Sequence, residues 1–118
     1  MEQPISRQTH GVIDYAYGAL VAALPEAAGF SNEKNATTLC RVLAGGALTY
    51  SLLTDAEWGV AKVIPFKKHL LIDLSTNVLA LGMPWLLGFA GNTKARNSIL
   101  ALALSGIAVS LLTKPENR

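Results

Sequence analysis

The chain has 118 residues, the length of a single domain, and 51% of them are hydrophobic. Only 15% are charged, against roughly 25% in an average soluble domain. A net charge of +2 without a run of basic residues excludes a nucleic-acid-binding surface, and a single cysteine, Cys40, excludes an internal disulfide or a multi-cysteine metal site.

Four apolar segments lie between the clusters of charge, near residues 11–28, 37–53, 70–89 and 97–113. Each is about as long as a helix that crosses ~30 Å of hydrocarbon. The last segment shows almost no polar face, whereas a core helix of a soluble bundle normally keeps one. The pattern therefore predicts four transmembrane helices and the lipid bilayer as the main partner.

The first half of the chain predicts two of these helices. The first begins near Thr9 or His10 and runs to about residue 28, where Pro25 and Gly29 favour its end. The second runs from Thr37 or Thr38 to about residue 53. Its central small residues, 44–47, predict a seam that packs against a neighbouring helix.

The second half predicts the other two helices, over about 69–88 and 97–112. Before them, residues 55–68 combine Trp58 and Phe66 with several charges, which is typical of a segment at the level of the lipid headgroups. Pro65 ends any structure in that segment.

An internal repeat with an offset of 59 residues relates the two halves. The stretch 10–30 aligns without a gap with 69–89, and 51–54 aligns with 110–113, both reading Ser-Leu-Leu-Thr. We therefore expect one membrane domain over 1–118, with a first repeat at about 10–54, an interfacial linker at 55–68 and a second repeat at about 69–113. The predicted fold is all-α, a four-helix transmembrane bundle built from two tandem helical hairpins with a pseudo-two-fold axis along the membrane normal.

Two His-x-x-x-Asp pairs are the strongest candidates for chemistry. The i, i+4 spacing places His10 with Asp14, and His69 with Asp73, on one face of each helix. The repeat places both pairs at the same depth, so two imidazoles and two carboxylates can converge if the first and third helices are neighbours. Asn77 follows one turn after Asp73 and predicts a polar contact in the interior.

Three uses of these pairs remain open from the sequence. They can hold helices together, since an Asp in the first turn of a helix is stabilised by the helix dipole. They can bind a cofactor, because two nitrogens and two oxygens suit a divalent transition metal and two imidazoles can ligate haem iron. They can also relay protons, since ionisable residues in membrane segments are costly and usually functional.

The residues Met83-Pro84-Trp85-Leu86-Leu87-Gly88-Phe89, followed by Asn92 and a second apolar helix, resemble the SPW-repeat family of small bacterial membrane proteins. The resemblance covers about 69–113 well and about 10–54 more loosely. Met83 stands in place of the family's serine, and the first copy reads Leu24-Pro25-Glu26 without the tryptophan. The resemblance implies a four-helix protein of the bacterial inner membrane and supplies no catalytic residues.

The distribution of charge predicts that both termini are cytoplasmic. Six basic residues lie on the side of the termini and the linker, against four on the other side: Arg7, Lys62, Lys67, Lys68, Lys114 and Arg118 against Lys34, Arg41, Lys94 and Arg96. No nucleophile–base motif, phosphate loop or zinc signature is present, so the sequence does not favour an enzyme. We expect a structural or accessory membrane protein that can form homo-oligomers, with a metal- or haem-binding protein and an oligomeric proton-coupled transporter or channel as the alternatives.

Overall fold

A computed structural model describes residues 3–117; Met1, Glu2 and Arg118, the last of which belongs to the basic residues counted above, lie outside the described residues. The described chain forms four long helices, as the sequence predicts. They are α1 (Arg7–Ala27), α2 (Lys34–Leu52), α3 (Phe66–Leu86) and α4 (Thr93–Leu112). Two strands of two residues each, β1 (Thr54–Asp55) and β2 (Ile64–Pro65), pair in parallel in the connection between α2 and α3.

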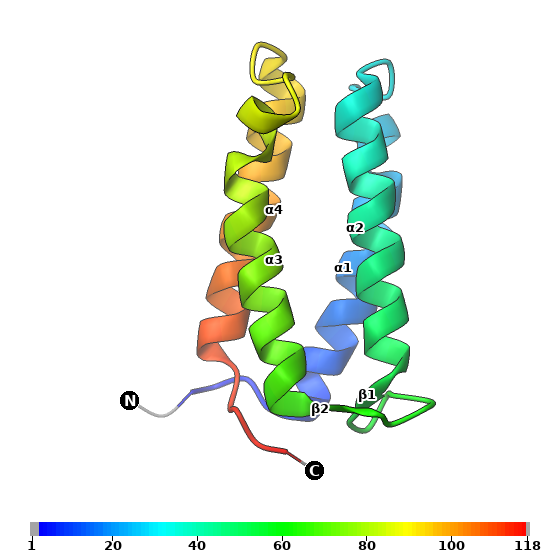
Figure 1. Cartoon of the computed structure of the whole chain (residues 1–118), viewed down its shortest axis with the longest axis vertical. Helices are drawn as coiled ribbons and strands as arrows, with labels where there is room; N and C mark the ends of the chain where they lie inside the picture. The colour runs from blue at the N-terminus through cyan, green and yellow to red at the C-terminus, as the bar shows by residue number, and fades with distance from the viewer. Residues whose placement is uncertain (1–2, 118) are drawn as a thin grey trace.

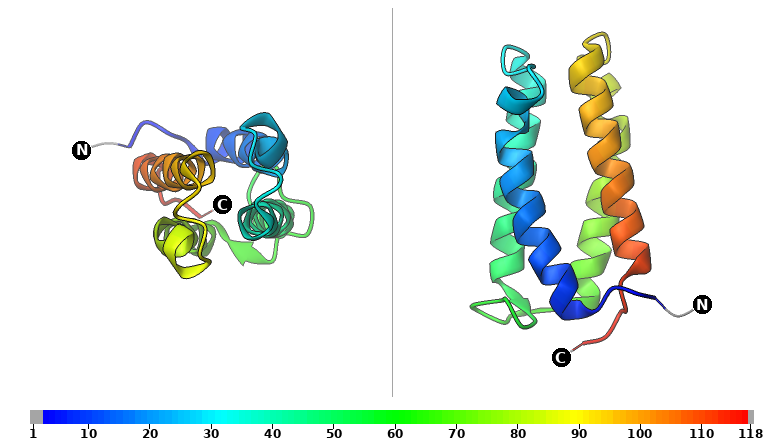
Figure 2. Two further views of the ribbon diagram at one scale, coloured as in Figure 1. Left: turned by 90° about the horizontal axis from the view of Figure 1, so that it is seen from above. Right: turned by 180° about the vertical axis from the view of Figure 1, so that it is seen from behind.

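The helices form two hairpins that stand side by side (Figure 1). Helix α1 packs along α2, and α3 packs along α4, while contact between the hairpins is sparser. Seen from above, the helices occupy the corners of a square in the order α1, α2, α3, α4, so α1 and α3 face each other across the centre (Figure 2). Both termini and the α2–α3 connection lie at one end, which we call the basal end, and the two hairpin turns lie at the other.

Helices α2, α3 and α4 begin three or four residues before their expected positions, and α1 begins two or three residues before. Polar caps explain two of these starts. The side chain of Ser6 accepts a hydrogen bond from the backbone of Thr9, and that of Asn92 accepts one from the backbone of Ala95. Hydropathy marked the apolar part of each helix and missed its polar first turn.

The ends of α1 and α3 are alike. Pro25 and Pro84 lie inside their helices, which continue for two further residues. Gly29 and Gly88 then adopt positive φ values of 79° and 76°, the left-handed conformation that glycine tolerates best. Backbone N–H groups of Phe30 and of its counterpart at position 89 close the turns on the carbonyls of the two prolines. The glycines therefore end these helices, and the prolines do not.

An apolar core joins the hairpins at the end opposite the termini. Its largest members are Phe30 and Phe89, which are 0% and 1% exposed. The same cluster contains Val21, Ala36, Cys40, Ala44, Ala95 and Ile99. Positions 59 residues apart are equally buried here, as Ala36 and Ala95 show with 0% exposure each.

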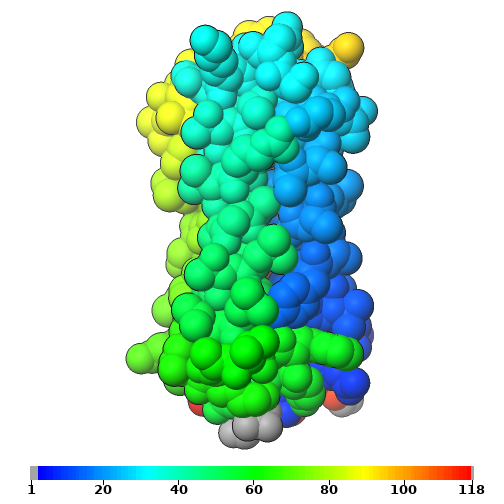
Figure 3. Space-filling view, turned by 90° about the vertical axis from the view of Figure 1, so that its right-hand side faces the viewer, coloured from blue at the N-terminus to red at the C-terminus, as the bar shows by residue number. Residues whose placement is uncertain are grey.

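The connection between α2 and α3 covers the basal end, where it forms a belt under α2 in the space-filling view (Figure 3). The indole of Trp58 donates to the carbonyl of Gln8 at 3.0 Å and packs against Gly11, where a Cβ atom would lie 2.4 Å from the ring. Tyr15 donates its hydroxyl to the carbonyl of Trp58 at 2.7 Å. These contacts fix the connection against the first turns of α1.

The small residues of α2 do not form the predicted helix contact throughout. Ala44 is buried in the core, but a Cβ atom added at Gly45 or Gly46 would meet nothing within 4 Å. The prediction of a seam is therefore wrong for the two glycines, because no described residue packs against them. Close approach occurs instead at Gly18, beside Leu48, and at Gly106, beside the side chain of Asn77.

One of the described helices, α4, is long and apolar enough by itself to cross a membrane. Its mean hydropathy is 1.6 over an 18-residue window, of which 22% is buried. This finding supports a membrane protein only weakly, and four separate crossings stay a prediction.

Candidate functional site

The two predicted His–Asp pairs converge between the hairpins at the basal end. Helix α1 contributes His10 and Asp14, and α3 contributes His69 and Asp73; these four residues form the His–Asp cluster. One ligand atom from each lies within 4.8 Å of the other three. The geometry follows from the arrangement of α1 and α3, which face each other and start at the same end.

The shortest contacts of the cluster join different repeats. Nε2 of His10 lies 2.8 Å from Oδ2 of Asp73, and Nε2 of His69 lies 2.7 Å from Oδ2 of Asp14. The contacts within each i, i+4 pair are longer, at 3.1 Å in α1 and 3.2 Å in α3. The four atoms thus form a closed ring in which nitrogen and oxygen alternate, and each carboxylate oxygen contacts both imidazoles.

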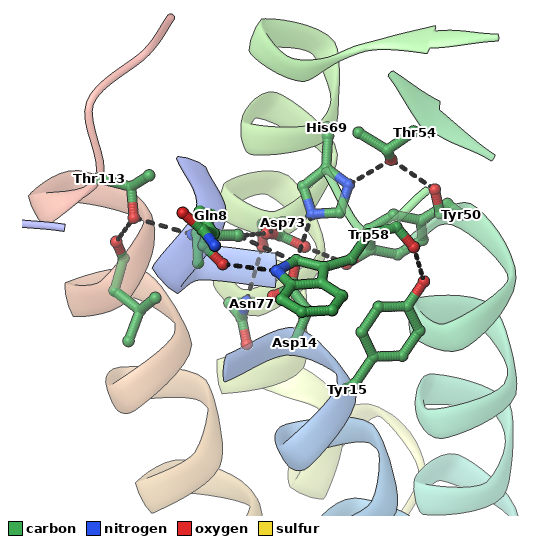
Figure 4. A network of polar contacts seen from close by, with 12 residues as sticks. Gln8, Asp14, Tyr15, Tyr50, Thr54, Trp58, His69, Asp73, Asn77 and Thr113 are labelled. Atoms are coloured by element: carbon green, nitrogen blue, oxygen red, sulfur yellow. Dashed lines mark hydrogen bonds and ion pairs between the residues drawn. The ribbon is translucent and has the colours of Figure 1, made fainter. Parts of the chain in front are cut away.

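Two threonines, Thr54 and Thr113, orient the imidazoles from outside the ring (Figure 4). Nδ1 of His69 lies 2.6 Å from Oγ1 of Thr54, and Nδ1 of His10 lies 2.8 Å from Oγ1 of Thr113. Each threonine hydroxyl donates its only proton to the carbonyl four residues earlier in the chain, that of Tyr50 or Val109.

That arrangement fixes the role of each ring nitrogen. Each threonine hydroxyl already donates its proton to a carbonyl, so its oxygen can only accept a hydrogen bond from the imidazole. Nδ1 of each histidine therefore carries the hydrogen. Each Nε2 atom then points into the ring. It is free to carry a second proton toward the carboxylates or to bind a metal ion.

The cluster is enclosed by aromatic rings. His10 and His69 are 1% and 2% exposed. Phe66, itself buried, stacks on His69 with ring centroids 5.8 Å apart and meets His10 edge-on at 5.5 Å. Tyr50 lies edge-on to His69 at 4.8 Å and donates its hydroxyl to Oδ1 of Asp73. These aromatic rings therefore shield the two imidazoles from solvent on the side that they cover.

Asn77 lies beside the cluster, not in it. Its amide donates to the backbone carbonyl of Asp73 at 2.7 Å, and its side chain packs against Gly106 of α4. The hydroxyl of Tyr17, 3.5 Å from Oδ1 of Asn77, donates to the carbonyl of Leu102 at 2.9 Å. Asn77 thus makes an interior polar contact with the backbone of Asp73, and no described contact joins it to the carboxylate.

Three contributing residues were not singled out as site residues from the sequence: Thr54, Thr113 and Tyr50. A signal for the threonines existed, because both end the repeated Ser-Leu-Leu-Thr stretch. Their partners lie in the opposite repeat, however, so sequence spacing could not link Thr54 to its histidine. Tyr50 has no counterpart in the second repeat, where position 109 is valine, and no signal marked it.

The ring can hold a divalent cation. Zinc binds nitrogen and carboxylate oxygen at ~2.0–2.2 Å, so neighbouring ligand atoms around it lie roughly 3 Å apart. The four contacts of the ring, at 2.7–3.2 Å, are close to that separation. Two neutral imidazoles and two carboxylates carry a charge of −2, which a divalent ion balances. Haem fits the geometry poorly, because both carboxylates lie within 3.2 Å of the two Nε2 atoms, where a porphyrin would have to pass.

Comparisons with protein-family models, with curated proteins and with solved structures gave no match for this chain. The resemblance to the SPW-repeat family therefore stays a prediction.

Proposed function

We propose that this chain is a multi-pass membrane protein that binds a divalent transition metal ion between its two hairpins. His10, Asp14, His69 and Asp73 are its ligands in this proposal. The observation that carries it is the pair of Nδ1–threonine hydrogen bonds, which leaves both Nε2 atoms directed at two carboxylate oxygens. Metal-binding histidines commonly donate their other N–H to such an outer partner, which fixes the tautomer and the ring orientation.

The composition of the site favours first-row transition metals over magnesium or calcium. Imidazole nitrogen suits zinc, copper, nickel and iron, whereas magnesium and calcium prefer shells made of oxygen alone. A ring of two nitrogens and two oxygens is also compatible with the tetragonal geometry of copper(II) or nickel(II). We therefore expect zinc, nickel or copper to bind, and magnesium not to compete at equal concentration.

The membrane part of the proposal rests on the distribution of polar groups. The helices have 19 to 21 residues, which gives about 28–32 Å of rise each and matches ~30 Å of hydrocarbon. Large apolar side chains are exposed on all four helices, among them Leu20, Val42, Leu79 and Leu104, while the histidines are buried. A soluble domain rarely exposes apolar surface over such a length.

The decisive experiment is metal analysis of protein purified in detergent without a histidine tag. The chain contains only two histidines, so the His10→Ala/His69→Ala double variant removes every imidazole. We expect the wild-type protein to retain about one zinc or nickel ion per chain after desalting, and the double variant to retain none. Glu26→Gln, an exposed acidic residue near the other end, is the matched control and should bind as the wild type does.

A second function is favoured by the short contacts themselves. At 2.7–2.8 Å, the two inter-repeat contacts are strong hydrogen bonds if both imidazoles are doubly protonated, and the ring is then a neutral pair of ion pairs that joins the hairpins. A metal-free wild-type protein whose melting temperature is the same with zinc and with a chelator would support this structural function and overturn metal binding.

Membrane insertion has a separate test. We expect the protein to remain in the membrane fraction of expressing bacteria after extraction with alkaline carbonate. Recovery in the soluble fraction as a monomer without detergent would contradict the four-span proposal. Reporter fusions at both termini test the orientation, with activity of a cytoplasmic reporter expected at each end.

A further inference from the structure

The two carboxylates of the His–Asp cluster have unequal surroundings. In Asp73, Oδ2 contacts the histidines and Oδ1 accepts the hydroxyl of Tyr50. In Asp14, Oδ2 makes the equivalent contacts, but no hydrogen bond from the described residues reaches Oδ1. One acceptor of the ring is therefore left open.

The residue that breaks the symmetry is Val109. Tyr50 and Val109 are 59 residues apart and occupy equivalent backbone positions, because each accepts the hydroxyl of the threonine four residues on. Each of those threonines holds the histidine of the opposite repeat. By this correspondence, the side chain at position 109 should donate a hydrogen bond to Asp14, as Tyr50 does to Asp73. Valine has neither an aromatic ring nor a hydroxyl and cannot do so.

A cavity of about 290 Å³ lies between the hairpins at this place. Asp14 and Val109 both line it, together with Gly46, and all four helices contribute to its wall. Most of the wall is apolar, and three residues of the cluster, His10, Asp14 and Asp73, are among its polar lining residues. An apolar cavity of 150 Å³ is enough to bind benzene, so this one has room for a substituted six-membered ring.

We propose that the cavity binds a phenolic ring whose hydroxyl donates a hydrogen bond to Oδ1 of Asp14. The hydroxyl of the ligand would donate to Asp14 the hydrogen bond that the hydroxyl of Tyr50 donates to Asp73. The apolar wall buries the ring, and the open carboxylate oxygen selects ligands that carry a donor. This site is additional to the metal site, because it uses Oδ1 of Asp14, whereas the contacts with the histidines are made by Oδ2.

The first test compares p-cresol, which is the side chain of tyrosine, with 4-methylanisole, its methyl ether. Both rings fit the cavity, but only p-cresol has a hydroxyl to donate. We expect calorimetric titration of the wild-type protein in detergent to show at least tenfold tighter binding of p-cresol, as a hydrogen bond to a charged acceptor provides. Equal affinities, or no binding of either compound, would overturn the proposal.

Substitutions at two positions locate the site. Gly46→Leu places a side chain in the cavity and should abolish p-cresol binding, whereas Gly45→Leu has equal open space around it but lies outside the cavity wall and should bind as the wild type does. Val109→Tyr and Val109→Phe should both exclude p-cresol. Of these two, Val109→Tyr should melt at the higher temperature, because its hydroxyl reaches Asp14.

The melting temperatures of the two Val109 variants test the proposal even if a variant loses p-cresol binding because its fold is disturbed. A Val109→Tyr protein no more stable than Val109→Phe would contradict the position assigned to the hydroxyl. Equal loss of p-cresol binding in Gly45→Leu and Gly46→Leu would contradict the cavity.

A second ligand distinguishes between two sources of the phenolic ring, a quinol of the membrane and a small free phenol. A hydroquinone with a ten-carbon alkyl chain represents quinols of the membrane, and p-cresol represents small free phenols. Tighter binding of the alkyl hydroquinone would assign the site to a membrane quinol, and binding of p-cresol alone would assign it to a small phenol. Titrations with and without a chelator separate this proposal from the metal site, since the metal-free protein should bind p-cresol as well.

Discussion

At the basal end the hairpins meet through the His–Asp cluster, whereas at the opposite end they meet through Phe30 and Phe89. Both ends obey the same 59-residue repeat, and both are almost completely buried. The basal contact is directional, since each nitrogen must face a particular oxygen. The far contact is apolar and depends on the area and volume that the rings fill.

The two ends therefore stabilise the arrangement of the hairpins in different ways. Removing one partner from a buried ion pair leaves a charge without compensation, so the basal end fixes one relative position of the hairpins and tolerates few substitutions. Apolar packing loses stability in proportion to the atoms removed. Variants at the two ends should therefore differ in the size of their effects.

The largest effect is expected for Asp73→Ala. The substitution leaves two buried imidazoles and the hydroxyl of Tyr50 short of an acceptor, and it should lower the free energy of unfolding by about 3–5 kcal/mol. Unfolding with dodecyl sulfate in mixed micelles measures this change. Glu26→Ala, which removes an exposed carboxylate paired with Arg41, should leave the free energy of unfolding almost unchanged. Equal costs for the two variants would show that the cluster does not hold the hairpins.

Thr113→Val should have the next largest effect. Nδ1–H of His10 loses its buried acceptor, at a cost of about 1–3 kcal/mol, and zinc affinity should fall about 10- to 100-fold. Thr49→Val is the matched control, because Thr49 also donates to a carbonyl four residues earlier but has no described contact with a histidine. A Thr113→Val protein with unchanged zinc affinity would contradict the orienting role of the threonine.

At the far end, Phe89→Leu should lower the free energy of unfolding by about 1–2 kcal/mol through lost packing. Zinc affinity should stay at the wild-type value, since the residue is remote from the cluster. Combined with Asp73→Ala, its cost should add to within about 0.5 kcal/mol, as expected for sites without shared partners. Strong non-additivity in the double variant would mean that the two ends act as one unit.

An effect no larger than that of Phe89→Leu is expected for Gly88→Ala. Its positive φ of 76° strains any residue with a Cβ atom, so the substitution should cost about 1–2 kcal/mol although nothing lies within 4 Å of the new atom. Gly91→Ala has equal space and no positive φ, and it should change stability by less than about 0.5 kcal/mol. Similar melting temperatures for the two variants would contradict the role of Gly88 as the helix terminus.

The sequence predicted four helices because each apolar segment is continuous and bounded by charge. It placed helix starts too late, because the first turns of α2 and α4 are helical although they contain polar residues such as Lys34, Asn35 and Lys94. The repeat predicted that the two His–Asp pairs lie at one depth. Whether α1 and α3 would face each other was not predictable, since the order of helices around a bundle depends on contacts between distant residues.

The pairing inside the cluster shows the limit of arguments from spacing. The i, i+4 rule predicts that His10 contacts Asp14, and that contact exists at 3.1 Å. The shorter contact, to Asp73, joins residues 63 positions apart and follows only from the packing of the hairpins. Tyr50 and Val109 both line the cavity, and this difference between the repeats is likewise not displayed by an alignment of their shared residues.

The exchange of partners between repeats bears on how such a molecule could arise. Each hairpin holds the other's histidine with its own threonine, so a single hairpin contains every type of residue in the ring but cannot close it alone. Two copies of one hairpin, related by a two-fold axis, would close it. Gene duplication and fusion of such a self-pairing ancestor would give the present chain, and once fused, either half could change separately, as positions 50 and 109 have done.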